Sequence, residues 1–234
     1  MTAAAATPTP QETHFAMLSA RVPVAGRRIL DIGCGSGAFL ELLLAGGADA
    51  TGMEVAEETL ARAAAAGIDP ARLALGDGRT LPFADASFDC ACFMFSFHHV
   101  PADLRTTVLA EAARVLADDG TLVAIEPLPA GPMSEALAPI EDETEVRTAA
   151  QALLADPPAP FVLAETAHYE IARTYASHDA MIRNAVEVDA ARAVPAARPD
   201  VVAAVQERFS RLATPVEGGF ELRQPCVLYR FRKA

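Results

Sequence analysis

Hydrophobic and polar residues alternate along the first half of the chain in a pattern typical of strands followed by helices. Short apolar runs predict strands, and segments with apolar residues three or four positions apart predict helices. The predicted strands are 28–33, 49–54, 73–75, 88–97 and 121–126, and the predicted helices are 38–45, 56–66 and 103–116. We expect Asp103 to cap the last of these helices and Gly120 to end it. The regular alternation favours an α/β fold with a Rossmann-like, doubly wound, mostly parallel sheet.

The pattern changes after residue 127. Helices are predicted near 143–154 and at 178–190 and 199–212, and strands at 161–171 and 220–231. A segment inserted before the last strand of such a sheet can lie as a helical cap over the carboxyl edge, where ligands bind. We expect one domain over 1–234, with a loose tail at 1–10, a cofactor-binding core at 27–127, a cap-containing region at 128–218 and a last antiparallel strand at 219–232. The acidic run at 141–145 is expected to be the solvated start of a helix.

Charge and composition narrow the possible partners. The net charge is −12 and Lys233 is the single lysine, which disfavours a nucleic-acid substrate because such binders neutralise phosphates with basic residues. No window approaches the roughly 18 apolar residues of a membrane-spanning helix, and the start of the chain lacks the basic and apolar stretches of a secretory signal. We expect a cytoplasmic protein that acts on a small molecule, as a monomer or a homodimer.

The cysteines do not indicate a metal centre. Their spacing gives no CxxC pair and no zinc pattern. We expect all four to be small core residues in a reducing compartment, and we expect no metal site. The four are Cys34, Cys90, Cys92 and Cys226.

A glycine-rich turn follows the first predicted strand. Gly33, Gly35 and Gly37 lie between that strand and the next helix, where glycines permit a tight turn and close approach of a ligand to the backbone. Glu54 ends the second strand, and a carboxylate there can accept hydrogen bonds from both ribose hydroxyls. The same loop, with Ala38, also satisfies the GxGxxG/A pattern of dinucleotide-binding proteins.

Two acidic residues distinguish the two readings of this loop. Asp31 lies in the approach to the loop, where it would repel a pyrophosphate and attract the ammonium group of an amino acid. Asp77 follows the third strand between two glycines, where its carboxylate can accept a hydrogen bond from the adenine amino group. Asp-Gly pairs also favour plain turns.

The motifs together resemble those of class I S-adenosylmethionine-dependent methyltransferases, in the small-molecule, type 11-like branch. The resemblance covers about residues 27–127. The matching stretches are Leu30-Asp31-Ile32-Gly33-Cys34-Gly35-Ser36-Gly37, then 76–78 with 81–89, then Ser96-Phe97-His98-His99-Val100, and 114–116 with 119–122. It implies S-adenosylmethionine as the cofactor and S-adenosylhomocysteine as the product.

The resemblance also implies a role for individual residues. The methionine part of the cofactor would lie against Asp31 and the loop of Gly33, Gly35 and Gly37, and the backbone near Phe95 would close that end. Glu54 would hold the ribose. The adenine would contact Asp77 and Gly78, with Met53 and Phe83 as apolar walls. Val55-Ala56 departs from many relatives, which carry a polar residue at the start of the next helix.

Three further residues are candidates for catalysis. His98 and His99 follow the fourth strand, and an imidazole can take a proton from an acceptor near neutral pH. If the strand continues through them, their side chains point to opposite faces. Glu126 ends the fifth strand at the same edge and could orient an acceptor. All three could equally be structural residues that close their strands.

The sequence therefore indicates a methyltransferase that moves a methyl group to a small molecule by in-line displacement. A dinucleotide-dependent oxidoreductase is the main alternative, although it leaves Asp77 unexplained and lacks a Tyr-x-x-x-Lys arrangement. A non-catalytic, S-adenosylmethionine-binding regulatory protein is a second alternative, because this transfer needs no invariant catalytic residue.

Overall fold

The computed structural model describes residues 8–234. The part of the expected tail at 1–7 lies outside these residues. Thr9 and Pro10, which the sequence reading also placed in the tail, instead begin helix α1 (Pro10–Ser19). The side chain of Thr9 accepts a hydrogen bond from the Glu12 backbone, and the Glu12 side chain accepts one from the Thr9 backbone. This capping box fixes where the helix begins.

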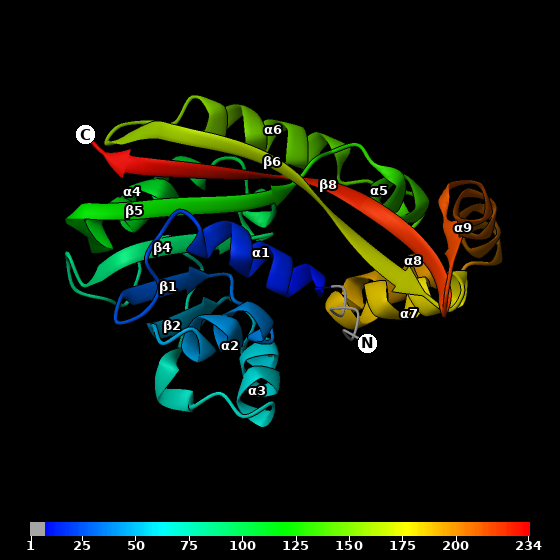
Figure 1. The fold of residues 1–234 in the computed structure, drawn as a ribbon, viewed down its shortest axis with the longest axis horizontal. Helices are drawn as coiled ribbons and strands as arrows, with labels where there is room; N and C mark the ends of the chain where they lie inside the picture. The colour runs from blue at the N-terminus through cyan, green and yellow to red at the C-terminus, as the bar shows by residue number, and fades with distance from the viewer. Residues whose placement is uncertain (1–7) are drawn as a thin grey trace, which may run out of the picture. The chain divides into compact units, whose positions relative to one another are not determined.

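One sheet runs through the molecule in the order β3-β2-β1-β4-β5-β8-β6, with β7 paired to β8 (Figure 1). Strand β1 pairs in parallel with β2 and β4, and the pairs β2–β3 and β4–β5 are also parallel. The predicted mostly parallel sheet with a last antiparallel strand is confirmed. The strands are β1 (Arg28–Ile32), β2 (Asp49–Glu54), β3 (Leu73–Leu75), β4 (Phe88–Met94), β5 (Leu116–Pro127), β6 (Phe161–Tyr175), β7 (Thr214–Val216) and β8 (Gly219–Lys233).

The chain forms two compact units. Unit 1 consists of the described residues up to 126, together with 149–168 and 227–234, and unit 2 consists of 127–148 and 169–226. Strands β6 and β8 contribute residues to both. The helices of the chain after α1 are α2 (Ala38–Ala45), α3 (Glu57–Ala65), α4 (Arg105–Val115), α5 (Pro132–Leu137), α6 (Thr144–Ala155), α7 (His178–Val188), α8 (Ala193–Ala196) and α9 (Pro199–Leu212), with short 3-10 turns η1 (Pro70–Arg72), η2 (Phe97–His99) and η3 (Ala190–Arg192).

The core of unit 1 surrounds β1 and β4. Both strands have neighbours on each side, which is why their sequences are apolar at successive positions rather than at alternate ones. Leu30, Ala91 and Phe93 are at most 1% exposed, as are Leu40 and Leu43 of α2. Burial of one such large side chain contributes roughly 2 kcal/mol. All four cysteines are buried, as the sequence predicted, and none of them forms a disulfide.

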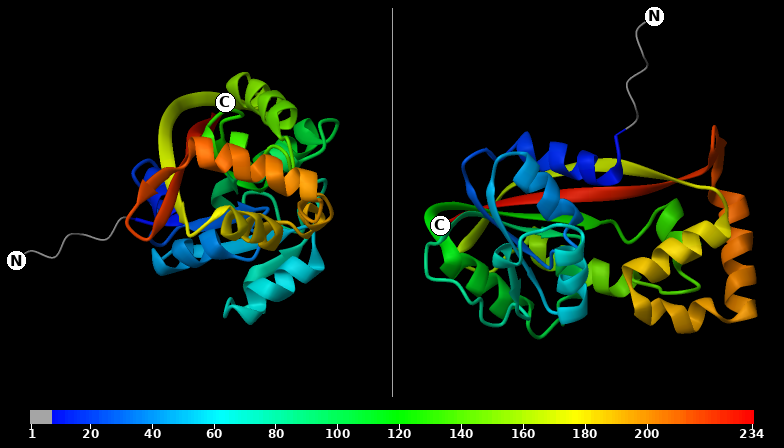
Figure 2. Two further views of the ribbon diagram at one scale, coloured as in Figure 1. Left: turned by 90° about the vertical axis from the view of Figure 1, so that its right-hand side faces the viewer. Right: turned by 90° about the horizontal axis from the view of Figure 1, so that it is seen from below.

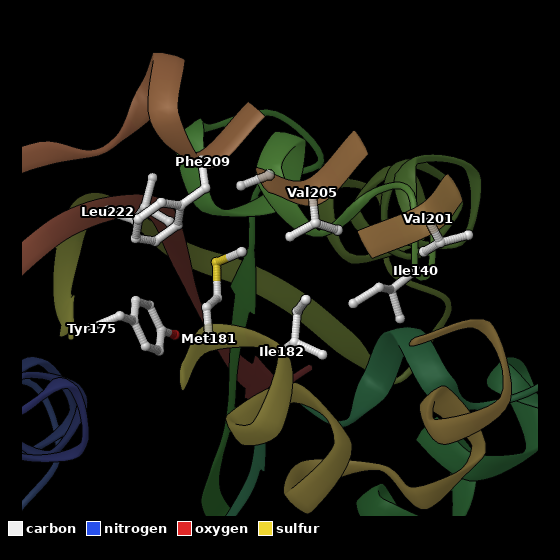
Figure 3. Packing of buried hydrophobic residues seen from close by; sticks show 9 residues of the cluster. Ile140, Tyr175, Met181, Ile182, Val201, Val205, Phe209 and Leu222 are labelled. Atoms are coloured by element: carbon white, nitrogen blue, oxygen red, sulfur yellow. The ribbon is translucent and has the colours of Figure 1, made fainter. Parts of the chain in front are cut away.

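Unit 2 has a hydrophobic cluster of its own, shown in Figure 3. Helix α9 packs on α5 and α7, and Figure 2 shows the orange α9 beside the yellow α7. The cluster draws on these helices and on the strand ends nearest to them. Its buried members are Ala136, Ile140, Tyr175, Met181, Ile182, Val201, Val205, Phe209 and Leu222.

Three sequence-based expectations about the elements are wrong. Strand β4 ends at Met94 instead of continuing to residue 97, because the chain turns at Phe95 with φ of +54°. Asp103 does not cap α4, whose N-cap is Leu104 with no side-chain hydrogen bond. The helix ends at Val115, close to the predicted end at 116, but Gly120 does not end it, because β5 already begins at Leu116, which pairs with Phe88 of β4, and not at 121.

The acidic run before α6 is not fully solvated either. The side chain of Glu143 is only 10% exposed and forms ion pairs with Arg147 and Arg192. Arg192 also pairs with Glu141 at 2.5 Å. The expectation of a solvated run fails at Glu143 because two arginines, one of them distant in the sequence, neutralise its charge within unit 2. No described helix combines the length and apolar character needed to cross a bilayer.

Candidate functional site

The glycine loop leaves β1 in a conformation that only small residues permit. Gly33 has φ of +77°, and its N–H and that of Cys34 donate to the Met53 carbonyl at 2.7 and 3.0 Å. A Cβ on Gly33 would lie 2.5 Å from the Cβ of Ser96, whose hydroxyl donates to the Ile32 carbonyl at 2.6 Å. The loop is therefore held tightly between β2 and the turn after β4.

Gly37 is the N-cap of α2 and has φ of +89°. A Cβ at this position would overlap the end of the Ile68 side chain, whereas a Cβ on Gly35 would meet nothing within 4 Å. We expect Gly37→Ala to lower the free energy of unfolding by roughly 2–3 kcal/mol, and Gly35→Ala by only about 1 kcal/mol from backbone strain. Urea unfolding without a cofactor measures both values, and equal losses would contradict the role of Ile68.

Glu54 connects the loop to the start of α3. Its carboxylate accepts hydrogen bonds from the backbone N–H groups of Gly35 at 3.0 Å, Val55 at 2.8 Å and Ala56 at 3.2 Å. The N-cap Ala56 makes no side-chain cap, in line with the predicted departure at 55–56. Glu54 therefore holds the glycine loop and the backbone that leads into α3 through one carboxylate.

Asp31 is fully buried on β1 beside this loop. Its Oδ1 contacts the Cys92 thiol at 3.7 Å, and its Oδ2 has no hydrogen-bond partner. Burial, together with the nearby charge of Glu54, raises the pKa of Asp31 to about 7. A buried carboxylate with an unused oxygen is costly to ionise without a cation. This position therefore suits a positively charged ligand group.

Asp77 lies on the loop after β3 and is bound by Arg79, which the sequence analysis did not single out. Its Oδ1 accepts from the Arg79 backbone at 3.0 Å, and its Oδ2 accepts from the Arg79 Nε at 2.6 Å. These bonds lower the pKa of Asp77, so the carboxylate is ionised at neutral pH. The neighbouring Gly78 has φ of +81°, and its Cα faces Val108 of α4.

Met53 and Phe83, the two residues expected to form apolar walls, both lie in unit 1. Met53 is 2% exposed on β2, and its sulfur lies near Gly76. Phe83 is partly buried, with its ring 5.0 Å from that of Phe88. The segment that carries Phe83 is fastened by Arg114, which donates to the Phe83 carbonyl at 2.9 Å and to Asp85 at 2.7 Å.

Phe95 turns the chain after β4 in the left-handed region, which is rare for an aromatic residue and is typical of functional sites. Its N–H donates to the Ile125 carbonyl at 2.8 Å. The ring of His14 from α1 lies 4.7 Å from the Phe95 ring, edge to face. The sequence analysis missed His14, since nothing in the local pattern of α1 indicates which strand the helix covers.

His98 and Glu126 form a buried pair. They are 3% and 1% exposed, and His98 Nδ1 is hydrogen-bonded to Glu126 Oε2. The other oxygen of Glu126 accepts from the Phe97 N–H at 2.9 Å. A carboxylate on Nδ1 fixes the imidazole tautomer in which Nε2 is the proton acceptor.

The expectation that His98 and His99 point to opposite faces is wrong. Both lie in η2 rather than in a strand, and their ring centroids are 4.0 Å apart. His98 is buried whereas His99 is exposed. The strand rule of alternating faces does not apply once β4 has ended at Met94.

Arg105 is a second residue that the sequence analysis missed. It is 4% exposed at the start of α4 and donates to the carbonyls of Val100 at 3.0 Å and His98 at 3.1 Å. Burial lowers the pKa of Arg105, and the charge of Glu126 opposes that shift. Arg105 thus fixes the turn that carries His98 and places a positive charge near Glu126.

Known methyltransferases are similar in sequence to the part of the chain that contains the glycine loop and the loops beside it. Residues 30–124 match the family model Methyltransf_11, which is described as a methyltransferase domain. The 27-O-demethylrifamycin SV methyltransferase of Amycolatopsis mediterranei is 37% identical over 117 residues, which are 46% of this chain and 42% of that protein. A ubiquinone/menaquinone biosynthesis C-methyltransferase UbiE, from Dinoroseobacter shibae, is 39% identical over 119 residues, 47% of this chain and 46% of that protein.

These alignments span less than half the length of the curated relatives. The likeness of the fold extends further. The crystal structure of YcgJ from Bacillus subtilis matches with a TM-score of 0.61 at 18% identity, over 95% of this chain and 99% of that chain. The chain therefore shares the fold of YcgJ along nearly its whole length, and it shares sequence with methyltransferases around the site.

Proposed function

We propose that this chain, in which residues 30–124 match the Methyltransf_11 family model, transfers a methyl group from S-adenosylmethionine to a hydroxyl group of a small molecule. The observation that carries the transfer is the unused oxygen of Asp31 beside the glycine loop. The observation that carries the hydroxyl acceptor is the buried pair of His98 and Glu126.

The residues around the loop fit the cofactor. S-adenosylmethionine supplies a methyl group on a positively charged sulfur, which is already an activated leaving group. Asp31 would bind the ammonium of its methionine part, because the unused Oδ2 is an acceptor that needs a cation. Gly33, Gly35 and Gly37 would allow the backbone to approach that part closely.

The nucleoside would lie along the neighbouring loops. Glu54 would accept hydrogen bonds from the ribose hydroxyls, sharing oxygens that already accept from Gly35 and Val55. A carboxylate oxygen has two acceptor positions, so Asp77 can bind the adenine amino group while it remains paired with Arg79. Gly78, Met53 and Phe83 would enclose the ring, and the turn at Phe95 would close the methionine end.

A hydroxyl acceptor must lose its proton as its oxygen attacks the methyl group. His98 Nε2 would take that proton, and Glu126 would hold Nδ1–H and stabilise the charged imidazole. The exposed ring of His99 against His98 would help to keep the imidazole in position. The protein otherwise acts by orienting the acceptor and excluding water.

The two other readings of the chain receive less support. Asp31 is buried where a dinucleotide would bring its pyrophosphate close to the loop, and the two negative charges would repel each other. The buried carboxylate–imidazole pair favours catalysis over a purely regulatory role. The net charge of −12 again favours a small acceptor over a polyanion.

A turnover experiment tests the proposal. The protein is incubated with S-adenosylmethionine and a panel of small phenols, alcohols, amines and thiols, and the release of S-adenosylhomocysteine is measured. We expect turnover with hydroxyl acceptors. Turnover confined to amines or thiols would contradict the assigned acceptor, and release of no S-adenosylhomocysteine with any acceptor would favour the regulatory reading.

A further inference from the structure

Helix α1 brings a buried imidazole to the site from outside the residues that match the methyltransferase family. The match begins at residue 30, whereas His14 lies on α1 and is 3% exposed. The capping box at Thr9 fixes the start of the helix. In the middle of the helix, Phe15 packs closely against Gly46 after α2, where a Cβ would come within 2.7 Å of the Phe15 ring. The position of His14 is therefore set by both the start and the packing of α1.

His14 is placed at one particular end of the site. Its ring meets the edge of the Phe95 ring with centroids 4.7 Å apart. Ser96, the next residue, lies against Gly33 and bonds the Ile32 carbonyl. Two residues, Phe95 and Ser96, thus connect the imidazole to the glycine loop. This is the end where the methionine part of the cofactor would lie.

The charges at that end leave one group of the cofactor without a counterpart. The methionine part carries an ammonium and a carboxylate, and Asp31 suits only the ammonium. The loop from Gly33 to Gly37 contains no cationic side chain, and the carboxylate of Glu54 adds negative charge. A carboxylate needs a hydrogen-bond donor once it leaves water. An imidazole supplies one in its neutral form and two when it is charged.

We propose that His14 donates a hydrogen bond to the carboxylate of the methionine part of the cofactor. This inference rests on the proposed function, because it concerns the same ligand. It makes α1 a functional part of the site and His14 a determinant of cofactor selectivity.

The test compares two ligands that differ by one group. S-adenosylhomocysteine carries the carboxylate, and S-adenosyl-3-thiopropylamine lacks it but keeps the amine, the ribose and the adenine. Calorimetric titration gives the Kd of each ligand for the intact wild-type protein and for His14→Phe, which keeps an aromatic ring against Phe95. We expect the wild type to prefer S-adenosylhomocysteine by roughly 10–100-fold, the range of a hydrogen bond to a charged group. The preference should fall to about threefold or less in His14→Phe.

Two further variants separate binding from folding. His14→Gln retains a neutral donor and should keep part of the preference. Ser19→Ala, at an exposed position of the same helix, should leave the preference unchanged. If His14→Phe fails to fold, the preference measured in His14→Gln decides, and a value equal to that of the wild type then contradicts the proposal.

The outcomes distinguish this inference from the proposed function. If the wild type binds neither ligand, the proposed function fails. If the wild type binds both with equal affinity, or if His14→Phe weakens both by the same factor, the cofactor assignment stands and the role of His14 is overturned.

Discussion

Replacement of Asp31 by asparagine is expected to weaken the binding of S-adenosylhomocysteine while making the ligand-free protein harder to unfold. The buried carboxylate has one oxygen without a partner, and burial raises its pKa to about 7. Without a ligand, its charge is a cost to the fold. With the ligand bound, the same charge would pair with the ammonium. The variant removes both effects, so binding should fall by roughly 10–100-fold.

The stability gain should depend on pH with a defined sign. The native carboxyl holds its proton more tightly than the unfolded one, since its pKa rises from 3.8 to about 7. The tighter binding of the proton stabilises the wild-type fold fully below about pH 4. This contribution to the free energy of unfolding is lost as the pH rises through about 7. The shift corresponds to roughly 4 kcal/mol at most. We expect Asp31→Asn and the wild type to be similar near pH 4, and the variant to be more stable at pH 8.

Urea unfolding of the ligand-free protein between pH 4 and pH 8 measures this difference. Asp119→Asn is the matched control, because the Asp119 side chain is exposed. Its stability curve should run parallel to that of the wild type. Parallel curves for Asp31→Asn would show that the buried carboxyl is not the titrating group, and unchanged ligand affinity would contradict its contact with the ammonium.

Loss of His98 is expected to abolish most turnover without loss of cofactor binding. His98 Nδ1 is hydrogen-bonded to Glu126, and the proposal assigns Nε2 to the acceptor proton. Removal of a general base lowers kcat by roughly 10²–10⁴-fold. We expect His98→Gln to lie in this range with a hydroxyl acceptor, while its Kd for S-adenosylhomocysteine changes by less than about threefold.

Glu126→Gln tests the contribution of the carboxylate to the pair of His98 and Glu126. The amide keeps the shape but removes the charge, so we expect a smaller loss of kcat and a shifted pH–rate profile. His168→Gln, at an exposed position of β6, should match the wild type. Full activity in His98→Gln would contradict the assignment of His98 as the general base. An equal loss of cofactor binding in that variant would assign His98 a structural role instead.

The parts of the site that the sequence predicted are those with local signals. Helix α2 at 38–45 and strand β2 at 49–54 are found at their predicted bounds, because glycines and acidic residues mark the ends of these elements. The glycine positions follow from the same signals, since a left-handed turn at Gly33 and Gly37 excludes other residues. The buried pair of His98 and Glu126 was predicted only as two separate candidates, because their contact joins η2 to the end of β5.

The parts that the sequence did not predict depend on contacts between distant segments. His14 is placed near the site by its contact with Phe95, and Arg105 by its hydrogen bond to the carbonyl of His98. The apolar run through residue 97 gave no sign that the strand ends at Met94, because the turn at Phe95 is held by Ile125 of β5. Glu143 is paired with Arg192, nearly fifty residues further along the chain. The hydrophobic periodicity of a sequence reports local structure and does not indicate such distant pairs.

The most direct test of the central claim is calorimetric titration of the wild type and of Glu54→Gln with S-adenosylhomocysteine and, separately, with NADH. Both a methyltransferase and a dinucleotide-dependent oxidoreductase would use Glu54 to bind a ribose. The identity of the ligand that binds therefore distinguishes the two functions. We expect micromolar binding of S-adenosylhomocysteine by the wild type, binding weakened at least tenfold in the variant, and no binding of NADH. Binding of NADH in place of S-adenosylhomocysteine would contradict the methyltransferase assignment.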